Sequence, residues 1–64
     1  MSKLVGKKAE IIVKESWMYG EWGTIVDVDE DGYVYIAMEY NPYLVAQFTR
    51  KEIRIMKENK KNEN

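Results

Sequence analysis

The stretch of sequence that decides the fold is GEWGTIVDVDEDGYVYIAM, residues 20–38. Two apolar-rich segments flank the acidic turn Glu30-Asp31-Gly32, where glycine supplies the positive φ that a β-branched residue disfavours. The pattern predicts a β-hairpin with one strand from about Trp22 to Val28 and the next from Tyr33 to Glu39. Strict alternation fails at Ile25-Val26, which predicts either a bulge or burial on both faces.

Two further strands are predicted on either side of this hairpin. Residues 8–14 alternate apolar and charged side chains, apart from Ile12, which is typical of a half-buried strand. Asn41-Pro42 interrupts the pattern after the hairpin, because proline has no N–H to donate to a ladder. A fourth strand is predicted over residues 43–48.

The last part of the chain combines a turn, a fifth strand and a polar tail. Thr49 and Glu52 have the spacing of a capping box. Only one turn fits before alternation resumes over residues 53–56, so a single 3₁₀ turn is predicted. Residues 58–64 contain no apolar side chain and are predicted to be a disordered tail, which leaves one all-β domain over residues 1–57. The predicted core consists of Val5, Ala9, Ile11, Val13, Gly23, Ile25, Val28, Val34, Ile36, Met38, Leu44, Ala46, Phe48, Ile53 and Ile55.

The composition excludes several classes of function. The 64 residues include no Cys and no His, which rules out disulfides, thiolate zinc sites and haem attachment. The commonest general acid–base side chain is also missing. No hydroxyl group stands in a nucleophile motif, and the glycines do not form a phosphate-binding loop. We therefore predict a protein that is not an enzyme and needs no cofactor.

Neither a secretory signal nor a membrane span is predicted. Residues 1–12 lack the apolar run of a signal peptide. No stretch approaches the roughly 20 apolar residues of a transmembrane helix. We predict a soluble cytoplasmic protein, and the absence of Cys is compatible with a reducing compartment.

Five short strands, with a long loop after the first and a 3₁₀ turn before the last, resemble the SH3-like small barrels. The chain looks most like their KOW-type branch, whose hallmark Gly-x-x-Gly-x-hydrophobic matches residues 20–25, GEWGTI. The closing residues 48–55 are also similar to the end of such barrels, and the resemblance covers roughly residues 4–57. It implies a five-stranded SH3-like barrel with adjacent first and last strands. KOW-type barrels are often found in RNA-associated and transcription proteins.

Large aromatic side chains gather in two predicted loops, one between the first and second strands and one between the third and fourth. Five Tyr and two Trp exceed what a small core needs, and buried Tyr and Trp require partners for their polar atoms. Aromatic residues are enriched at interface centres, so we predict a face that binds a protein partner. The alternative is that Trp17 and Trp22 close the ends of the barrel. The candidate protein-binding residues are Trp17, Tyr19, Trp22, Tyr40 and Tyr43.

The net charge of −1 conceals an uneven distribution of charge. Residues 1–14 carry four bases and one acid (+3), residues 15–40 seven acids and no base (−7), and residues 41–64 six bases and three acids (+3). Adjacent first and last strands would join the basic ends into a surface for RNA or DNA, although the pI of 5.4 is low for this function. The alternative is that the lysines protect strand edges. The candidate nucleic-acid-binding residues are Lys7, Lys8, Lys14, Arg50, Lys51 and Arg54.

The acidic middle of the chain suggests two smaller hypotheses. Asp27, Asp29 and Asp31 copy the first half of an EF-hand loop, but Met38 occupies the position of its bidentate glutamate. The plain interpretation is an acidic hairpin tip that favours solubility, with a weak cation site as the alternative. Seven carboxylates without a base also imitate a nucleic-acid backbone, so an acidic mimic is a minor alternative function.

Overall fold

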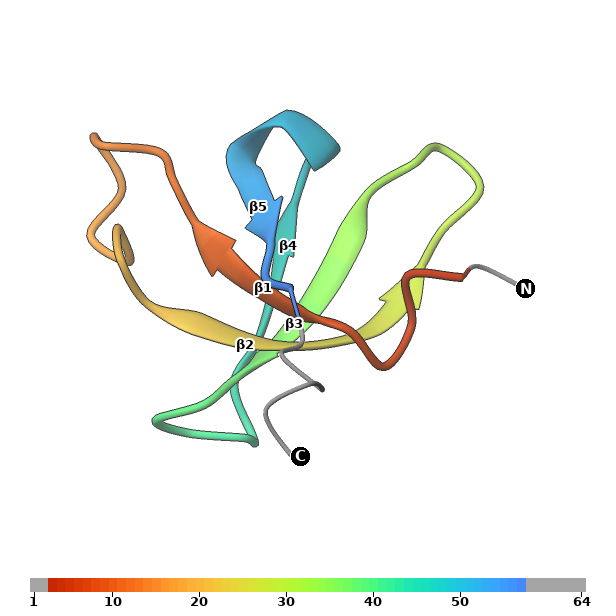
Figure 1. Ribbon diagram of the computed structural model, residues 1–64, viewed down its shortest axis with the longest axis horizontal. Helices are drawn as coiled ribbons and strands as arrows, with labels where there is room; N and C mark the ends of the chain where they lie inside the picture. The colour runs from red at the N-terminus through yellow and green to blue at the C-terminus, as the bar shows by residue number, and fades with distance from the viewer. Residues whose placement is uncertain (1–2, 58–64) are drawn as a thin grey trace, which may run out of the picture.

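The computed structural model describes residues 3–57 as one sheet of five antiparallel strands (Figure 1). The predicted tail over residues 58–64 lies outside the described residues. The all-β class and the 3₁₀ turn before the last strand are confirmed. The elements are β1 (Lys8–Ile11), β2 (Trp22–Val28), β3 (Val34–Met38), β4 (Val45–Phe48), the 3₁₀ helix η1 (Arg50–Glu52) and β5 (Ile53–Ile55).

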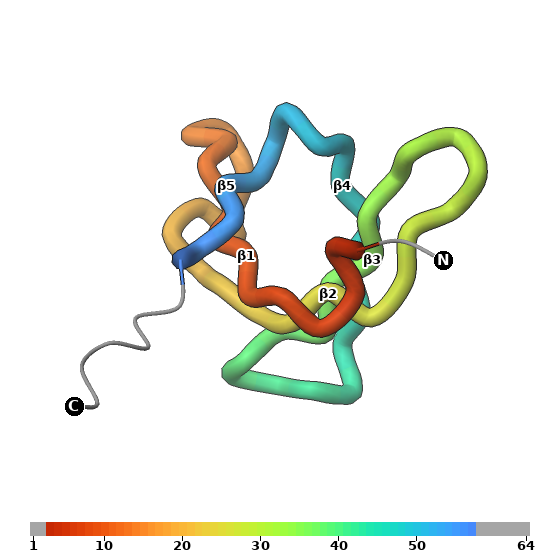
Figure 2. The backbone as a smooth tube through the Cα atoms, turned by 45° about the vertical axis from the view of Figure 1, so that its right-hand side comes forward, coloured from red at the N-terminus to blue at the C-terminus, as the bar shows by residue number. Residues whose placement is uncertain are grey.

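The strand order in the sheet is β4-β3-β2-β1-β5. The predicted contact between the first and last strands is confirmed, since β5 pairs with β1. The strands curl around a common centre (Figure 2), but the sheet is not closed into a barrel, because β4 and β5 are its two edges. The ladder of β4 ends at Phe48, and the Thr49 N–H then donates to Glu52 Oε1 at 2.8 Å. This bond is half of the predicted capping box, and it turns the chain into η1.

The central hairpin has the predicted turn, and it contains a bulge, one of the two alternatives predicted at Ile25-Val26. The Gly32 N–H donates to the Asp29 carbonyl oxygen at 3.0 Å, and Gly32 adopts a φ of 91°. The register between β2 and β3 shifts between Ile25 and Asp27. Val26 is the extra residue, and its side chain is 46% exposed. Of the two interpretations of the Ile25-Val26 pair, the bulge is therefore the correct one.

Four of the five strands are shorter than predicted. The strands predicted over residues 33–39 and 53–56 differ only by single residues at their ends, since β3 spans Val34–Met38 and β5 spans Ile53–Ile55. The strand predicted over residues 8–14 ends at Ile11, because the Ile12 N–H bonds to the Glu52 carbonyl oxygen and the chain then turns. The strand predicted from residue 43 begins at Val45, because Leu44 donates back to Asn41 within the loop.

The core lies on the inner face of the curled sheet. Val5 is a wrong prediction, since its side chain is 45% exposed, and Val13 is only half-buried. The prediction missed Met18, which belongs to a loop and is 5% exposed. Leu4, also missed, packs against the edge of the core together with Val28, Leu44, Ala46 and Ile55. The buried hydrophobic residues are Ala9, Ile11, Met18, Ile25, Val34, Ile36, Met38, Phe48 and Ile53.

Candidate functional site

Most of the predicted protein-binding aromatics are exposed. Trp17 and Tyr43 have exposed fractions of 79% and 96%, and Tyr19 and Tyr40 are about half exposed. Trp22 is half-buried on the outer face of β2. The core cluster includes none of these five side chains. Burial in the core therefore does not explain their size.

The two aromatic loops flank the start of β2. The loop between β1 and β2 closes through mutual bonds between Ile11 and residues 20 and 21. The loop between β3 and β4 starts where the Glu39 N–H donates to the Trp22 carbonyl oxygen at 2.9 Å. Figure 1 shows both loops on the same side of the molecule, one above and one below the first residues of β2. Trp22 begins β2 directly after the first loop, and its carbonyl oxygen accepts the bond at which the second loop starts.

A buried methionine orients the aromatics of the first loop. The Met18 N–H donates to Ser16 Oγ at 3.0 Å, and the Tyr19 N–H donates to the Ser16 carbonyl oxygen. Met18 enters the core, while its neighbours Trp17 and Tyr19 are exposed. A lone apolar residue among aromatics gives no periodic signal. The sequence prediction therefore treated Met18 as one more loop residue.

The second loop presents its aromatics in a similar way. The Tyr43 N–H donates to Asn41 Oδ1 at 3.2 Å, and the Leu44 N–H donates to the Asn41 carbonyl oxygen at 2.9 Å. Leu44 packs against the core. Tyr43, next to Leu44, and Tyr40, on the other side of Asn41, both remain exposed on this loop.

The predicted basic and aromatic residues meet at one point of the outer face. Lys8 Nζ lies 5.4 Å from the centroid of a Trp22 ring and donates to Thr24 Oγ1 at 3.1 Å. The cation–π contact orients the Trp22 indole, and together with the hydrogen bond it gives the Lys8 ammonium partners within the protein. Arg54 forms an ion pair with Glu10 across the β1–β5 ladder. Both cations therefore already have partners within the protein.

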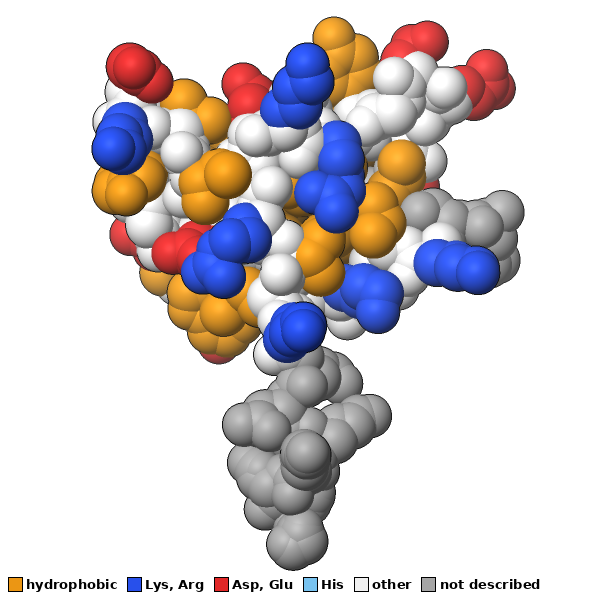
Figure 3. Space-filling view, turned by 45° about the horizontal axis from the view of Figure 1, so that its top comes forward, with side chains coloured by type: hydrophobic (Ala, Val, Ile, Leu, Met, Phe, Trp, Pro, Cys, Tyr) orange, Lys and Arg blue, Asp and Glu red, His pale blue; other side chains and the backbone are white. Residues whose placement is uncertain are grey.

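The remaining predicted cations lie around β5 and η1. Lys7 adjoins the end of β5, because the Met56 N–H donates to the Lys8 carbonyl oxygen at 2.9 Å. Arg50 and Lys51 are exposed on η1. Lys14 follows the point where Ile12 bonds to the backbone of η1. Figure 3 shows Lys and Arg side chains spread over one face between hydrophobic ones, with Asp and Glu mainly toward its rim.

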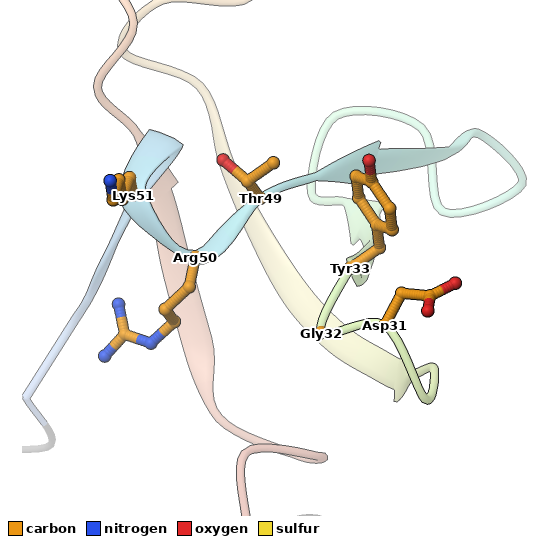
Figure 4. A pocket seen from close by; sticks show the side chains of 6 residues that line it. All are labelled: Asp31, Gly32, Tyr33, Thr49, Arg50 and Lys51. Carbon is orange, nitrogen blue, oxygen red and sulfur yellow. The ribbon is translucent and has the colours of Figure 1, made fainter.

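A hollow of about 640 Å³ lies between the β2–β3 hairpin and η1. Its lining includes two of the predicted cations, Arg50 and Lys51, opposite Asp31, Gly32 and Tyr33. In Figure 4 the Arg50 guanidinium and the Asp31 carboxylate point to opposite sides of this hollow. The polar groups do not converge on a common point, so the hollow has no arrangement suited to acid–base chemistry.

Two of the three predicted cation ligands, Asp27 and Asp29, accept hydrogen bonds within the hairpin through their carboxylates. Asp29 Oδ1 accepts the N–H groups of Asp31 and Tyr33, both at 3.0 Å, and Asp29 Oδ2 accepts the Tyr35 hydroxyl at 2.8 Å. Asp27 Oδ1 accepts the N–H of Val28. Within residues 3–57, no group of three or more acidic side chains is placed to hold a metal ion.

The Asp29–Tyr35 hydrogen bond shifts the pKa values of both groups. The Tyr35 hydroxyl, followed by backbone N–H donors, lowers the pKa of Asp29, and desolvation partly opposes this. The same bond to Asp29 raises the pKa of Tyr35, and a hydrogen bond from Gln47 opposes that shift. The bonded pair is an ionised carboxylate and a neutral phenol. It fixes the shape of the hairpin tip.

We expect the hairpin tip to loosen at both extremes of pH. A lowered Asp29 pKa stabilises the fold above the unfolded value of about 3.9 and loses this contribution as pH falls through the folded pKa. A raised Tyr35 pKa stabilises the fold below about 10 and loses this contribution as pH rises through the folded pKa. NMR titration of the Asp29 carboxyl and Tyr35 ring carbons measures both shifts. Tyr35→Phe should return the Asp29 pKa toward its ordinary value, and an unchanged Asp29 titration would contradict the assignment.

Among residues 3–57, no helix is long and apolar enough to cross a membrane. Comparison with protein-family models finds no family that matches the chain, and comparison with curated proteins finds no matching relative. The case for a function therefore depends on the geometry described above.

Proposed function

We propose that the protein is a non-enzymatic binding module of the cytoplasm that engages a protein partner through the two aromatic loops. The observation that carries this proposal is the exposure of Trp17 and Tyr43, at 79% and 96%, beside a core that does not need them. We define the aromatic surface as Trp17, Tyr19, Trp22, Tyr40 and Tyr43.

The physical argument is the cost of leaving such side chains in water. A large apolar side chain loses about 1.5–3 kcal/mol of favourable transfer free energy when it stays exposed. Trp and Tyr are also the residues that most often dominate interface energies. Met18 and Leu44 hold the two loops on the core, so the exposed rings are carried by anchored segments. Anchoring lowers the entropy cost of binding.

We further propose that the fold is an SH3-like barrel of the KOW-type branch. The strand order, with the last strand beside the first, and the 3₁₀ turn before β5 support this assignment. The GEWGTI segment enters β2, as the KOW-type pattern requires. In this scheme four of the five residues of the aromatic surface belong to loops, which carry recognition in many rigid β scaffolds, and Trp22 begins β2.

The proposal predicts that single aromatic substitutions strongly weaken partner capture without unfolding the protein. The full chain, immobilised as bait in a lysate of its source cells, should retain a defined protein at moderate salt. Trp17→Ala and Tyr43→Ala should weaken binding by about 30-fold, the effect of losing a 2 kcal/mol hot spot. Val26→Ala is the matched control, because Val26 is exposed on β2 outside both loops. Equal capture by all four baits would contradict the aromatic surface.

Nucleic-acid binding is the second candidate, and the basic face in Figure 3 favours it. An NMR titration with single-stranded RNA and DNA at low and moderate salt separates the two candidates. Shifts in β1, η1 and β5 that fade with salt would support nucleic acid, since phosphate contacts release counterions. Such shifts would contradict the protein-binding proposal if Trp17→Ala left them unchanged.

A further inference from the structure

The outer edge of β4 presents unpaired backbone groups. Met38 donates to the Leu44 carbonyl oxygen, and bonded pairs alternate along an antiparallel ladder, so Ile36–Ala46 and Val34–Phe48 are the next bonded pairs. The N–H and C=O groups of Val45 and Gln47 therefore point away from β3. Neither residue has another backbone partner in the described part of the chain.

The side chains along this edge offer no protection against strand pairing. Residues 43–49, YLVAQFT, contain no charge, glycine or proline. Val45 is 50% exposed, and Gln47 is also exposed. Natural sheets usually guard open edges with lysine, proline or a bulge. The other edge of the sheet follows this rule, because β5 carries Arg54 and is followed by Lys57.

We propose that β4 is an association surface for a second copy of this chain, paired antiparallel about a two-fold axis at Ala46. This register places Val45 opposite Gln47 of the second copy, and Gln47 opposite its Val45. Both residues then exchange N–H···O=C bonds with their counterparts, which satisfies the groups that β3 leaves free. The small Ala46 side chains face each other at the axis. The interface is isologous, as expected for a closed dimer.

Charge favours a second copy of this chain as the occupant of this edge. Antiparallel pairing at Ala46 directs residues 39–44 of one copy toward η1 of the other. That loop carries the Glu39 carboxylate and the exposed rings of Tyr40 and Tyr43. The 3₁₀ helix η1 carries Arg50 and Lys51, while its Glu52 carboxylate accepts the Thr49 N–H of its own chain. Opposite charges and cation–π contacts therefore meet on both sides of the axis. A dimer through β5 would instead place cations of the two copies together.

The pairing is short, because Thr49 donates its N–H to Glu52 and cannot extend the edge. We therefore expect association at high protein concentration only. Sedimentation equilibrium of the full chain up to about 1 mM, where weak dimers form, should show the mass rising from 7.6 kDa toward twice that value. Hydrogen exchange over the same range should show protection of the Val45 and Gln47 amides that increases with concentration.

Three substitutions make the test specific. Val45→Lys should abolish the mass increase, because it places a charge on the edge of each copy. Val45→Thr keeps the β-branched shape without charge and should associate like the wild type. Val26→Lys is the matched control, with nearly the same exposure on a central strand, and it should also associate. A monomer throughout the range, or equal loss in Val26→Lys and Val45→Lys, would overturn the proposal. The dimer shares Tyr40 and Tyr43 with the aromatic surface but does not use Trp17. Loss of partner capture in Trp17→Ala therefore tests the proposed function alone, and loss of the mass increase in Val45→Lys tests the dimer alone.

Discussion

Gly23→Ala is expected to destabilise the protein by about 3 kcal/mol or more, a large share of its total stability. A Cβ atom at Gly23 would lie 2.2 Å from the Ala37 carbonyl oxygen and 2.9 Å from the Ala37 carbonyl carbon. These are backbone atoms of the central strand β3, so no side chain can rotate away to make room. The third near neighbour, Ile36 Cγ2 at 2.8 Å, is itself in the packed core.

The size of this effect follows from the small stability of the domain. Overpacking a core costs about 1–3 kcal/mol and occasionally more, and a rigid backbone clash belongs at the upper end. A domain of this length has roughly 3–10 kcal/mol of stability in total. Urea unfolding followed by Trp fluorescence and far-UV circular dichroism measures the loss.

Thr24→Ala is the control for Gly23→Ala. Thr24 is the next residue of the same strand, half-buried on the outer face, where its hydroxyl accepts a bond from Lys8. Removing this hydroxyl should lower the free energy of unfolding by about 1 kcal/mol or less. Wild-type stability in Gly23→Ala would show that β2 and β3 are not as close at this point as the structure places them.

Met18→Ala should destabilise the fold by about 2–5 kcal/mol, the range for truncating a buried apolar side chain. Met18 is 5% exposed although it lies in the loop between β1 and β2. Truncation leaves a cavity at the edge of the core and releases the loop from its anchor. The same urea titration measures the change in stability. The Tyr19 N–H bonds to the Ser16 carbonyl oxygen and the Gly20 N–H to the Ile11 carbonyl oxygen, so faster hydrogen exchange of these amides reports the loosening of the loop.

Trp17→Ala is the matched control for Met18→Ala. It removes the larger side chain from the adjacent position, but that side chain is 79% exposed. Exposed substitutions of this kind usually change stability by less than about 0.5 kcal/mol. If Trp17→Ala proved the more destabilising of the two, the loop would have its buried and exposed faces reversed.

The sequence predicted the strands and the turn because their signals are local. Alternation over residues 34–38 depends only on which side chains share a face. Gly32 marks the hairpin turn through its own backbone freedom. The Ile25-Val26 pair showed that alternation breaks, and the structure identified a bulge with Val26 outward.

Contacts between residues far apart in the chain could not be predicted from the sequence. Met18 enters the core only because the loop folds back over the strands. Val5 resembles a core residue by composition, yet the Gly6–Ile25 backbone bond fixes a path that leaves its side chain exposed. The Arg54–Glu10 and Lys8–Trp22 contacts involve two cations, Lys8 and Arg54, that the sequence prediction treated as available to a nucleic acid.

The sequence by itself thus determined the all-β class, the hairpin, the 3₁₀ turn and the aromatic character of the loops, since each depends on neighbours along the chain. Only the tertiary structure decided that the sheet stays open between β4 and β5. It also decided which cations already have partners and which aromatic rings remain in solvent. These properties depend on the register of strands far apart in sequence, and register is set by the packing of the whole core.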